Sequence, residues 1–173
     1  MKSTPLRHPR PAPSVDILVE SEMWWALPEV EDIVRQAIAF AATSKFVINR
    51  PNTEISVLLC DDETIAGLNA RWRGQDKPTN VLSFPAPAQQ GAAPEKISLG
   101  DIAIAYETLA REAGEQGKPV SNHLSHLVVH GFLHLVGYDH HEDGEAEEME
   151  RLERDILGRI GIADPYAVGD VNI

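Results

Sequence analysis

Residues 126–140 read HLVVHGFLHLVGYDH and contain a spaced set of three histidines, His130, His134 and His140. The apolar residues around His130 and His134 recur with helical spacing, so both histidines are predicted to lie on one helix. Residues four apart share one face of a helix, so both imidazoles can reach one ion. Gly137 follows where a helix can end in a left-handed turn, which would return the chain and bring His140 toward the same ion.

This spacing predicts a metal centre with three neutral nitrogen ligands. Three protein ligands leave a fourth position for water, which is typical of a catalytic rather than a structural zinc site. Imidazole also suits other first-row metals, so the spacing leaves the identity of the metal open. His126 is an alternative third ligand, but ligands on three consecutive turns of a straight helix span too far for one tetrahedral ion. We therefore expect His126 in the core or beside a ligand, and His123 and His141 at the surface.

The same spacing, with glutamate after the first histidine, defines the metzincin proteases, in which that glutamate is the general base. Gly131 occupies the position here and cannot take a proton from a metal-bound water. This argues against proteolysis and favours a reaction in which a metal and a protein cation supply the electrostatic stabilisation. Asp139 and Asp101 are candidates for a general base, or for accepting a histidine N–H.

A locally basic segment, residues 69–85 with the sequence NARWRGQDKPTNVLSFP, interrupts an acidic chain. It holds three basic residues against one acidic residue, and Trp72 stands between Arg71 and Arg73. Guanidinium groups beside an aromatic ring are suited to contact phosphate and to stack on single-stranded bases. The same composition is also typical of a solvated helix end, so both interpretations stay open at this point.

The segments HGFLHLVGYDH, WRGQDKPTNVLSFP and LGDIAI closely resemble the YbeY family of bacterial metal-dependent endoribonucleases and rRNA maturation factors. The resemblance covers about residues 15–160 and departs from the family at Trp72, where tyrosine is common. It implies an α+β fold in which the three histidines hold one divalent metal, most often zinc. It also implies that Arg73 faces the metal across a cleft and binds the scissile phosphate, with Arg73 and His130 as catalytic residues.

The expected function is metal-assisted cleavage of RNA phosphodiesters, with Arg73 stabilising the charge that develops on the phosphate. The resemblance implies action on single-stranded RNA, in maturation of the 16S rRNA 3′ end and in ribosome quality control. The expected partners are rRNA and the small ribosomal subunit with its assembly factors, in the cytoplasm, without membrane or DNA. Two alternatives stay open: a metallopeptidase or amide hydrolase with a metzincin-like site, and a ribosome-assembly factor with a structural metal. Gly131 and the poor Met-turn offered by Met149 count against the first, and an open metal position counts against the second.

Apolar periodicity predicts an α+β domain with a small mixed sheet of about four strands and about five helices. Strands are expected over 15–20, 53–60, 79–84 and 101–104, and helices over 28–41, 62–70, 106–116, 121–135 and 143–160. Asp61 or Asp62 is expected to cap the second helix, and Ser121 the fourth. A single domain, residues 14–165, is expected between a flexible proline-rich tail, 1–13, and a C-terminal tail, 166–173.

Composition gives the chain of 173 residues a formal net charge of −12, which by itself argues against a nucleic-acid partner. Half of that charge lies in residues 142–155, EDGEAEEMERLERD, where a solvated helix face is expected. The acidic total therefore does not exclude RNA, but it predicts weak binding to arbitrary RNA and guidance by a ribosomal partner. Cys60 is the single cysteine and is expected in the core, and no apolar run is long enough to span a bilayer.

Overall fold

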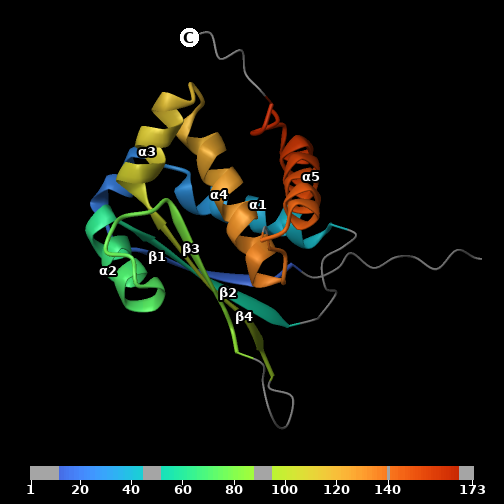
Figure 1. Cartoon of the computed structure of the whole chain (residues 1–173), viewed down its shortest axis with the longest axis horizontal. Helices are drawn as coiled ribbons and strands as arrows, with labels where there is room; N and C mark the ends of the chain where they lie inside the picture. The colour runs from blue at the N-terminus through green and yellow to red at the C-terminus, as the bar shows by residue number, and fades with distance from the viewer. Residues whose placement is uncertain (1–11, 45–51, 88–94, 140, 168–173) are drawn as a thin grey trace, which may run out of the picture.

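The computed structural model describes residues 12–44, 52–87, 95–139 and 141–167, which form a four-stranded sheet and its covering helices (Figure 1). The strands are β1 (Ser14–Val19), β2 (Thr53–Cys60), β3 (Val81–Pro85) and β4 (Ile97–Ala105). The helices are η1 (Glu22–Ala26, a 3₁₀ helix), α1 (Val30–Ala42), α2 (Asp62–Arg73), α3 (Tyr106–Glu115), α4 (Val120–Leu135) and α5 (Asp143–Ile160). The α+β class predicted from the sequence, with about four strands and five helices, is confirmed.

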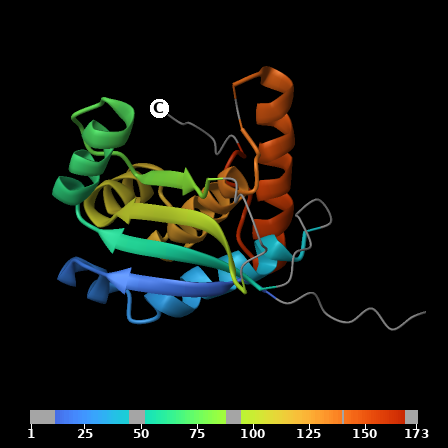
Figure 2. The same cartoon turned by 90° about the horizontal axis from the view of Figure 1, so that it is seen from below.

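The sheet has the order β1-β2-β4-β3, which Figure 2 shows with the strands side by side. β1, β2 and β4 run parallel, and β3 pairs antiparallel with β4. One face of β2 is buried along the whole strand, whereas on the other face Ser56 is exposed and only Cys60, at the apolar end of the strand, is buried. Val57 and Leu59 join the main core on one face, while Cys60 joins a smaller cluster on the other.

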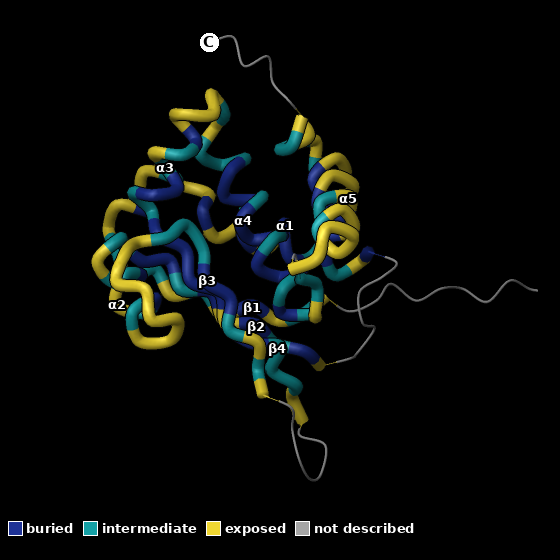
Figure 3. The backbone as a smooth tube through the Cα atoms, in the orientation of Figure 1, coloured by how far each residue is buried: buried dark blue, intermediate teal, exposed yellow. Residues whose placement is uncertain are grey.

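Helices cover the two faces of the sheet unequally. The main core packs α1, α3, α4 and α5 against one face, where Ile102 and Ile104 of β4 are fully buried. The smaller cluster lies under α2 on the opposite face and includes Ile65 and Ala103. In Figure 3 the buried residues follow α4 and the strands, so the histidine-bearing helix lies at the centre of the molecule.

Helix α4 approaches the sheet closely at Gly131. The Ser83 hydroxyl of β3 donates to the Gly131 carbonyl over 3.2 Å. A Cβ at Gly131 would lie 3.1 Å from the Ser83 Oγ and 3.1 Å from the Ile102 Cγ2. Both distances are shorter than most contacts that a Cβ makes in proteins. The position after the first histidine therefore faces the sheet, and glycine there lets the helix lie close to β3 and β4.

β4 begins four residues earlier than the sequence predicts, and a glycine explains how. The register of β2 against β4 shifts between Glu54 and Ile55, which pair with Ser98 and Gly100. Gly100 has φ 131°, and a Cβ there would lie 2.2 Å from the Phe84 carbonyl oxygen. This register shift therefore requires glycine at position 100. It lets β4 start at Ile97, on the N-terminal side of the GDI segment (residues 100–102).

Two predicted helix starts are wrong, and a third is confirmed. Pro28 lies in the turn before α1, and Pro119 rather than Ser121 occupies the N-cap of α4. The proline at the α4 cap has φ −60°, which already suits the entry to a helix. Asp61 caps α2 as predicted, because its Oδ1 accepts the Thr64 N–H over 2.8 Å.

Several predicted features lie wholly or partly outside the described residues. They are the proline-rich tail up to residue 11, His140, and the C-terminal tail from residue 168. Within the described part of the chain, no helix combines the length and the apolar character that crossing a membrane requires. Cys60 is fully buried as expected, and burial raises the pKa of its thiol to about 12.

Candidate metal centre

A stripe of histidines runs along one side of α4. Its four members are spaced three or four residues apart: His123, His126, His130 and His134. The centroids of successive rings are 6.0, 6.3 and 4.6 Å apart. The periodicity of the helix alone aligns the four imidazoles, but their chemistry depends on what other elements bring to each ring.

The turn after α4 orients His134. Gly137 takes φ 103°, as predicted, and the Tyr138 N–H donates to the Leu133 carbonyl over 3.0 Å, closing the helix end. This turn places the Tyr138 carbonyl oxygen 2.9 Å from the His134 Nδ1. Because a carbonyl oxygen only accepts, the Nδ1 of His134 donates, and when the ring is neutral its Nε2 is the nitrogen with the lone pair.

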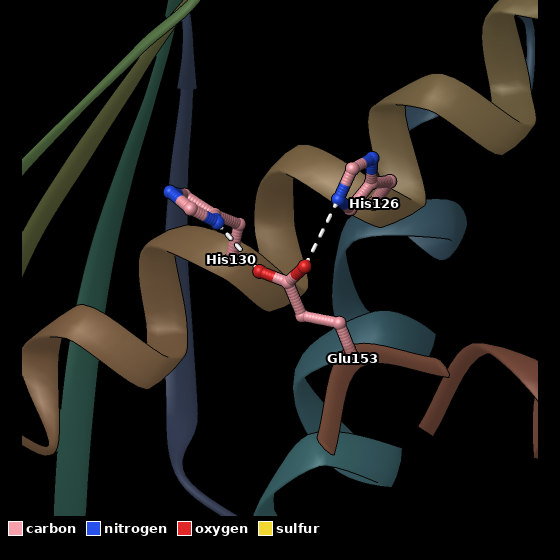
Figure 4. A group of neighbouring side chains, drawn as sticks. All are labelled: His126, His130 and Glu153. Atoms are coloured by element: carbon pink, nitrogen blue, oxygen red, sulfur yellow. Dashed lines mark hydrogen bonds and ion pairs between the residues drawn. The ribbon is translucent and has the colours of Figure 1, made fainter. Parts of the chain in front are cut away.

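A buried carboxylate from α5 orients His130. The side chain of Glu153 is fully buried, and its Oε1 lies 2.5 Å from the His130 Nδ1 (Figure 4). Burial raises the pKa of Glu153, but hydrogen bonds from His126 and His130 outweigh burial and lower the pKa to about 2. The ionised carboxylate only accepts, so the Nδ1 of His130 donates, and when the ring is neutral its Nε2 is the nitrogen with the lone pair.

The Nε2 atoms of His130 and His134 face one another at 3.1 Å. At this distance the two nitrogens can share a cation, either a proton in an N–H···N hydrogen bond or a metal ion that both coordinate. Two nitrogen ligands of one tetrahedral zinc ion would lie roughly 3.3 Å apart, since zinc–nitrogen bonds are about 2.0–2.1 Å long. The donor pair therefore fits a divalent metal at this end of α4, and His140, the expected third ligand, lies outside the described residues.

Both histidines line a cavity of about 450 Å³, and Arg73 lines it with them. Arg73 is the last residue of α2, and its Nη2 donates to the Ser83 carbonyl over 3.2 Å. The hydroxyl of the same serine holds Gly131, next to His130. One residue of β3 thus ties the guanidinium to the helix that carries the histidines. The other described lining residues are Asn80, Val81, Ser83, Pro85, Gly137, Tyr138, Asp139 and His141.

Comparison with known families identifies the chain's relatives. The model of a family described as Endoribonuclease YbeY matches residues 19–161. The chain belongs to the YbeY family. Endoribonuclease YbeY of Rhodopseudomonas palustris (strain BisB18) is 54% identical over 160 residues, which cover 91% of this chain and 95% of that protein. Endoribonuclease YbeY of Nitrobacter winogradskyi is 55% identical over 159 residues, covering 90% of this chain and 83% of that protein. A solution structure from Thermotoga maritima aligns with a TM-score of 0.46 and 27% identity, covering 88% of this chain and 98% of that chain.

The predicted RNA-contacting residues separate onto two faces of this YbeY-family protein. Trp72 is 62% exposed and lines a second cavity, of about 1030 Å³, on the α2 side of the sheet. Asp101 lines the same cavity, because its neighbour Ile102 points to α4 and side chains alternate along a strand. Of the two carboxylates considered as bases, Asp139 is the one in the histidine cavity, where its Oδ2 lies 3.0 Å from the His141 Nε2.

The surface position predicted for His123 is wrong. The residue is 3% exposed, and its Nε2 lies 2.7 Å from the Glu112 Oε2 of α3. The packing of α3 on α4 supplies both the cover and the charged partner, neither of which the spacing of the histidines reveals. His141 is exposed, as expected, and the partly buried His126 lies beside Glu153, with its Nε2 3.2 Å from the Glu153 Oε2.

The solvated face predicted for residues 142–155 is wrong at Glu153. α5 packs its apolar residues into the core, and Glu153 stands on that same side because it follows Leu152 and precedes Ile156 by three residues. Helical periodicity in the sequence could have shown this carboxylate on the buried face. His126, His130 and Glu153 bring potential ligand atoms within 4.8 Å of one another, so this group could also hold a metal ion (Figure 4).

Proposed function

We propose that this protein is a metal-dependent endoribonuclease that cleaves single-stranded RNA in rRNA maturation, at the 16S rRNA 3′ end, and in ribosome quality control. Membership of the YbeY family supports the RNA-cleaving activity. The observation that carries the metal dependence is the 3.1 Å approach of the His130 and His134 Nε2 atoms, with the Nδ1 of each ring engaged elsewhere. A peptidase is less well supported, because the position of the metzincin base faces the sheet at Gly131.

In this proposal His130 and His134, with His140 as the third ligand, hold one divalent ion, which we take to be Zn²⁺. The ion would lower the pKa of a bound water or polarise a phosphoryl oxygen. Glu153 and the Tyr138 carbonyl hold the two ligand rings in the required orientation, since each engages the Nδ1 of one ring.

Arg73 binds the scissile phosphate in this proposal. A guanidinium has five N–H donors in a rigid fork, and the bond to the Ser83 carbonyl uses one of them. The remaining donors can contact two phosphate oxygens while the serine carbonyl keeps the group at the wall of the cavity. A cation fixed there stabilises the charge that develops on the phosphate during cleavage.

The acidic surface supports a substrate delivered by a partner rather than captured at random. The three basic residues of the segment 69–85 can neutralise only a few phosphates, in a chain of net charge −12. We therefore propose that the small ribosomal subunit and its assembly factors present single-stranded rRNA to the cavity in the cytoplasm.

The proposed function is tested by incubating the purified protein with single-stranded RNA or casein, with and without a chelator. We expect RNA cleavage that the chelator abolishes and added Zn²⁺ restores, no casein cleavage, and no RNA cleavage by His134→Ala. RNA cleavage that survives both the chelator and His134→Ala would contradict a metallonuclease. Cleavage of casein would support the metallopeptidase alternative instead.

A further inference from the structure

A buried hydrogen-bond network lies behind His130, on the side away from His134. Its centre is Glu153, whose Oε1 accepts from the His130 Nδ1 and whose Oε2 lies 3.2 Å from the His126 Nε2. Figure 4 shows the carboxylate between the two rings, with one oxygen directed at each. The Tyr166 hydroxyl donates to Oε2 as well and lies 3.2 Å from the His126 Nε2. One fully buried carboxylate therefore receives three side-chain donors.

The turn after α5 places Tyr166 in this network. The Asp164 Oδ1 accepts the Tyr166 N–H over 2.8 Å, and the Asp164 Oδ2 lies 3.3 Å from the Arg154 Nε. The same arginine stands over the Tyr166 ring, with its Cζ 5.7 Å from the ring centroid. Arg154 follows Glu153 directly in α5. The same turn of this helix therefore carries the carboxylate and the arginine that positions Tyr166 beside it.

Glu153 and the Nε2 of His130 act on opposite sides of one imidazole. A carboxylate that accepts from Nδ1 fixes the tautomer and the plane of the ring, and it raises the basicity of the opposite nitrogen. Both oxygens of Glu153 already accept hydrogen bonds. The carboxylate therefore influences the histidine site through the His130 ring. Its buried negative charge also favours a cation at the far side of the ring.

We propose that Glu153, held by His126 and Tyr166, is a positioning residue that fixes the His130 ring and thereby sets the affinity of the histidine site for its metal. The C-terminal turn that carries Tyr166 is then part of the support of the metal site. This inference rests on the proposed function, because it takes His130 and His134 as metal ligands.

Zinc affinity of the purified full chain, measured by competition with a chromogenic chelator, tests the proposal. Glu153→Gln keeps the shape of the side chain but removes its charge, and we expect zinc binding about 10–100-fold weaker. Tyr166→Phe removes one donor to the carboxylate, and we expect a loss of about three- to tenfold. Glu147→Gln, an exposed position on the same helix, is the matched control and should bind zinc like wild type.

A second readout separates positioning from mere stability. In metal-free protein, nitrogen-15 NMR should show His130 protonated at Nδ1 in wild type and a changed tautomer balance in Glu153→Gln. Wild-type zinc affinity in a folded Glu153→Gln protein would overturn the proposal. If that variant does not fold, wild-type affinity in Tyr166→Phe or Nε2 protonation of His130 in the wild-type protein would overturn it.

The two proposals fail in different ways. A wild-type protein that binds zinc tightly but does not cleave RNA contradicts the proposed function and leaves the role of Glu153 to be decided by the zinc affinities. A wild-type protein that binds no zinc overturns both.

Discussion

The protonation of two imidazoles decides the chemistry of the histidine stripe. Glu153 and the Tyr138 carbonyl engage the Nδ1 atoms of His130 and His134, and this leaves the two Nε2 atoms facing one another 3.1 Å apart. The histidine spacing predicts which residues share a helix face, but not which nitrogen is available. That depends on a carboxylate from α5 and on a carbonyl from the turn at Gly137.

Arg73→Glu should lower the rate of RNA cleavage by at least about 100-fold, because a fixed cation at the phosphate is replaced by an anion. Zinc content measured on the same sample should equal that of wild type, since Arg73 contacts Ser83 in this structure. Arg71→Glu changes the charge by the same amount two residues away, where the guanidinium stands over Trp72, and should have a much smaller effect. Loss of zinc in Arg73→Glu would show that the arginine is structural.

At the scale of elements, apolar periodicity predicted the positions of the main strands and helices, because burial of one face dominates their formation. It could not predict the extra length of β4, which depends on the conformation of Gly100. The burial of His123 was not predicted, and the burial of Glu153 was missed because the acidic composition of residues 142–155 suggested a solvated surface, although its helical spacing places it on the apolar face of α5. Each residue is covered by the helix that precedes its own along the chain, His123 by α3 and Glu153 by α4, and only the packing of these helices shows it.

Gly100→Ala should destabilise the protein by more than about 2 kcal/mol, because both the positive φ and the Phe84 carbonyl exclude a Cβ. Urea denaturation of the metal-free protein measures the free energy of unfolding. Gly67→Ala in α2 is the control, since a Cβ there meets nothing within 4 Å, and it should be neutral or stabilise by up to about 1 kcal/mol. Equal stability of Gly100→Ala and wild type would contradict the irregular pairing of β4.

Asp61→Ala should destabilise the protein by about 1 kcal/mol, because the N-cap of α2 loses its acceptor for the Thr64 N–H. That hydrogen bond lowers the pKa of Asp61, so its contribution is present at neutral pH and is lost as the pH falls below the ordinary carboxyl range. Unfolding of wild type and variant at pH 7 and pH 3 should therefore give a difference that shrinks in acid. A stability difference between wild type and Asp61→Ala that grows as the pH falls would contradict this role of the Asp61 carboxylate.

At the scale of the whole molecule, the acidic surface and the locally basic segment predict weak binding to RNA of arbitrary sequence. Three basic side chains should give a slope of about −2 for log affinity against log salt concentration on single-stranded RNA. Fluorescence anisotropy with a labelled oligonucleotide measures this slope. Tight binding at physiological salt with a much steeper slope would contradict guidance by a ribosomal partner.

The fold brings Arg73 from the end of α2 and the histidines from α4 to one cavity, and this arrangement is the basis of the proposed metal-dependent cleavage. The most direct test strips the purified protein of metal and then measures single-stranded RNA cleavage during titration with Zn²⁺. We predict no cleavage without metal and a rise that saturates at one zinc ion per chain. Metal-free protein that cleaves as fast as the zinc-loaded protein would contradict the account.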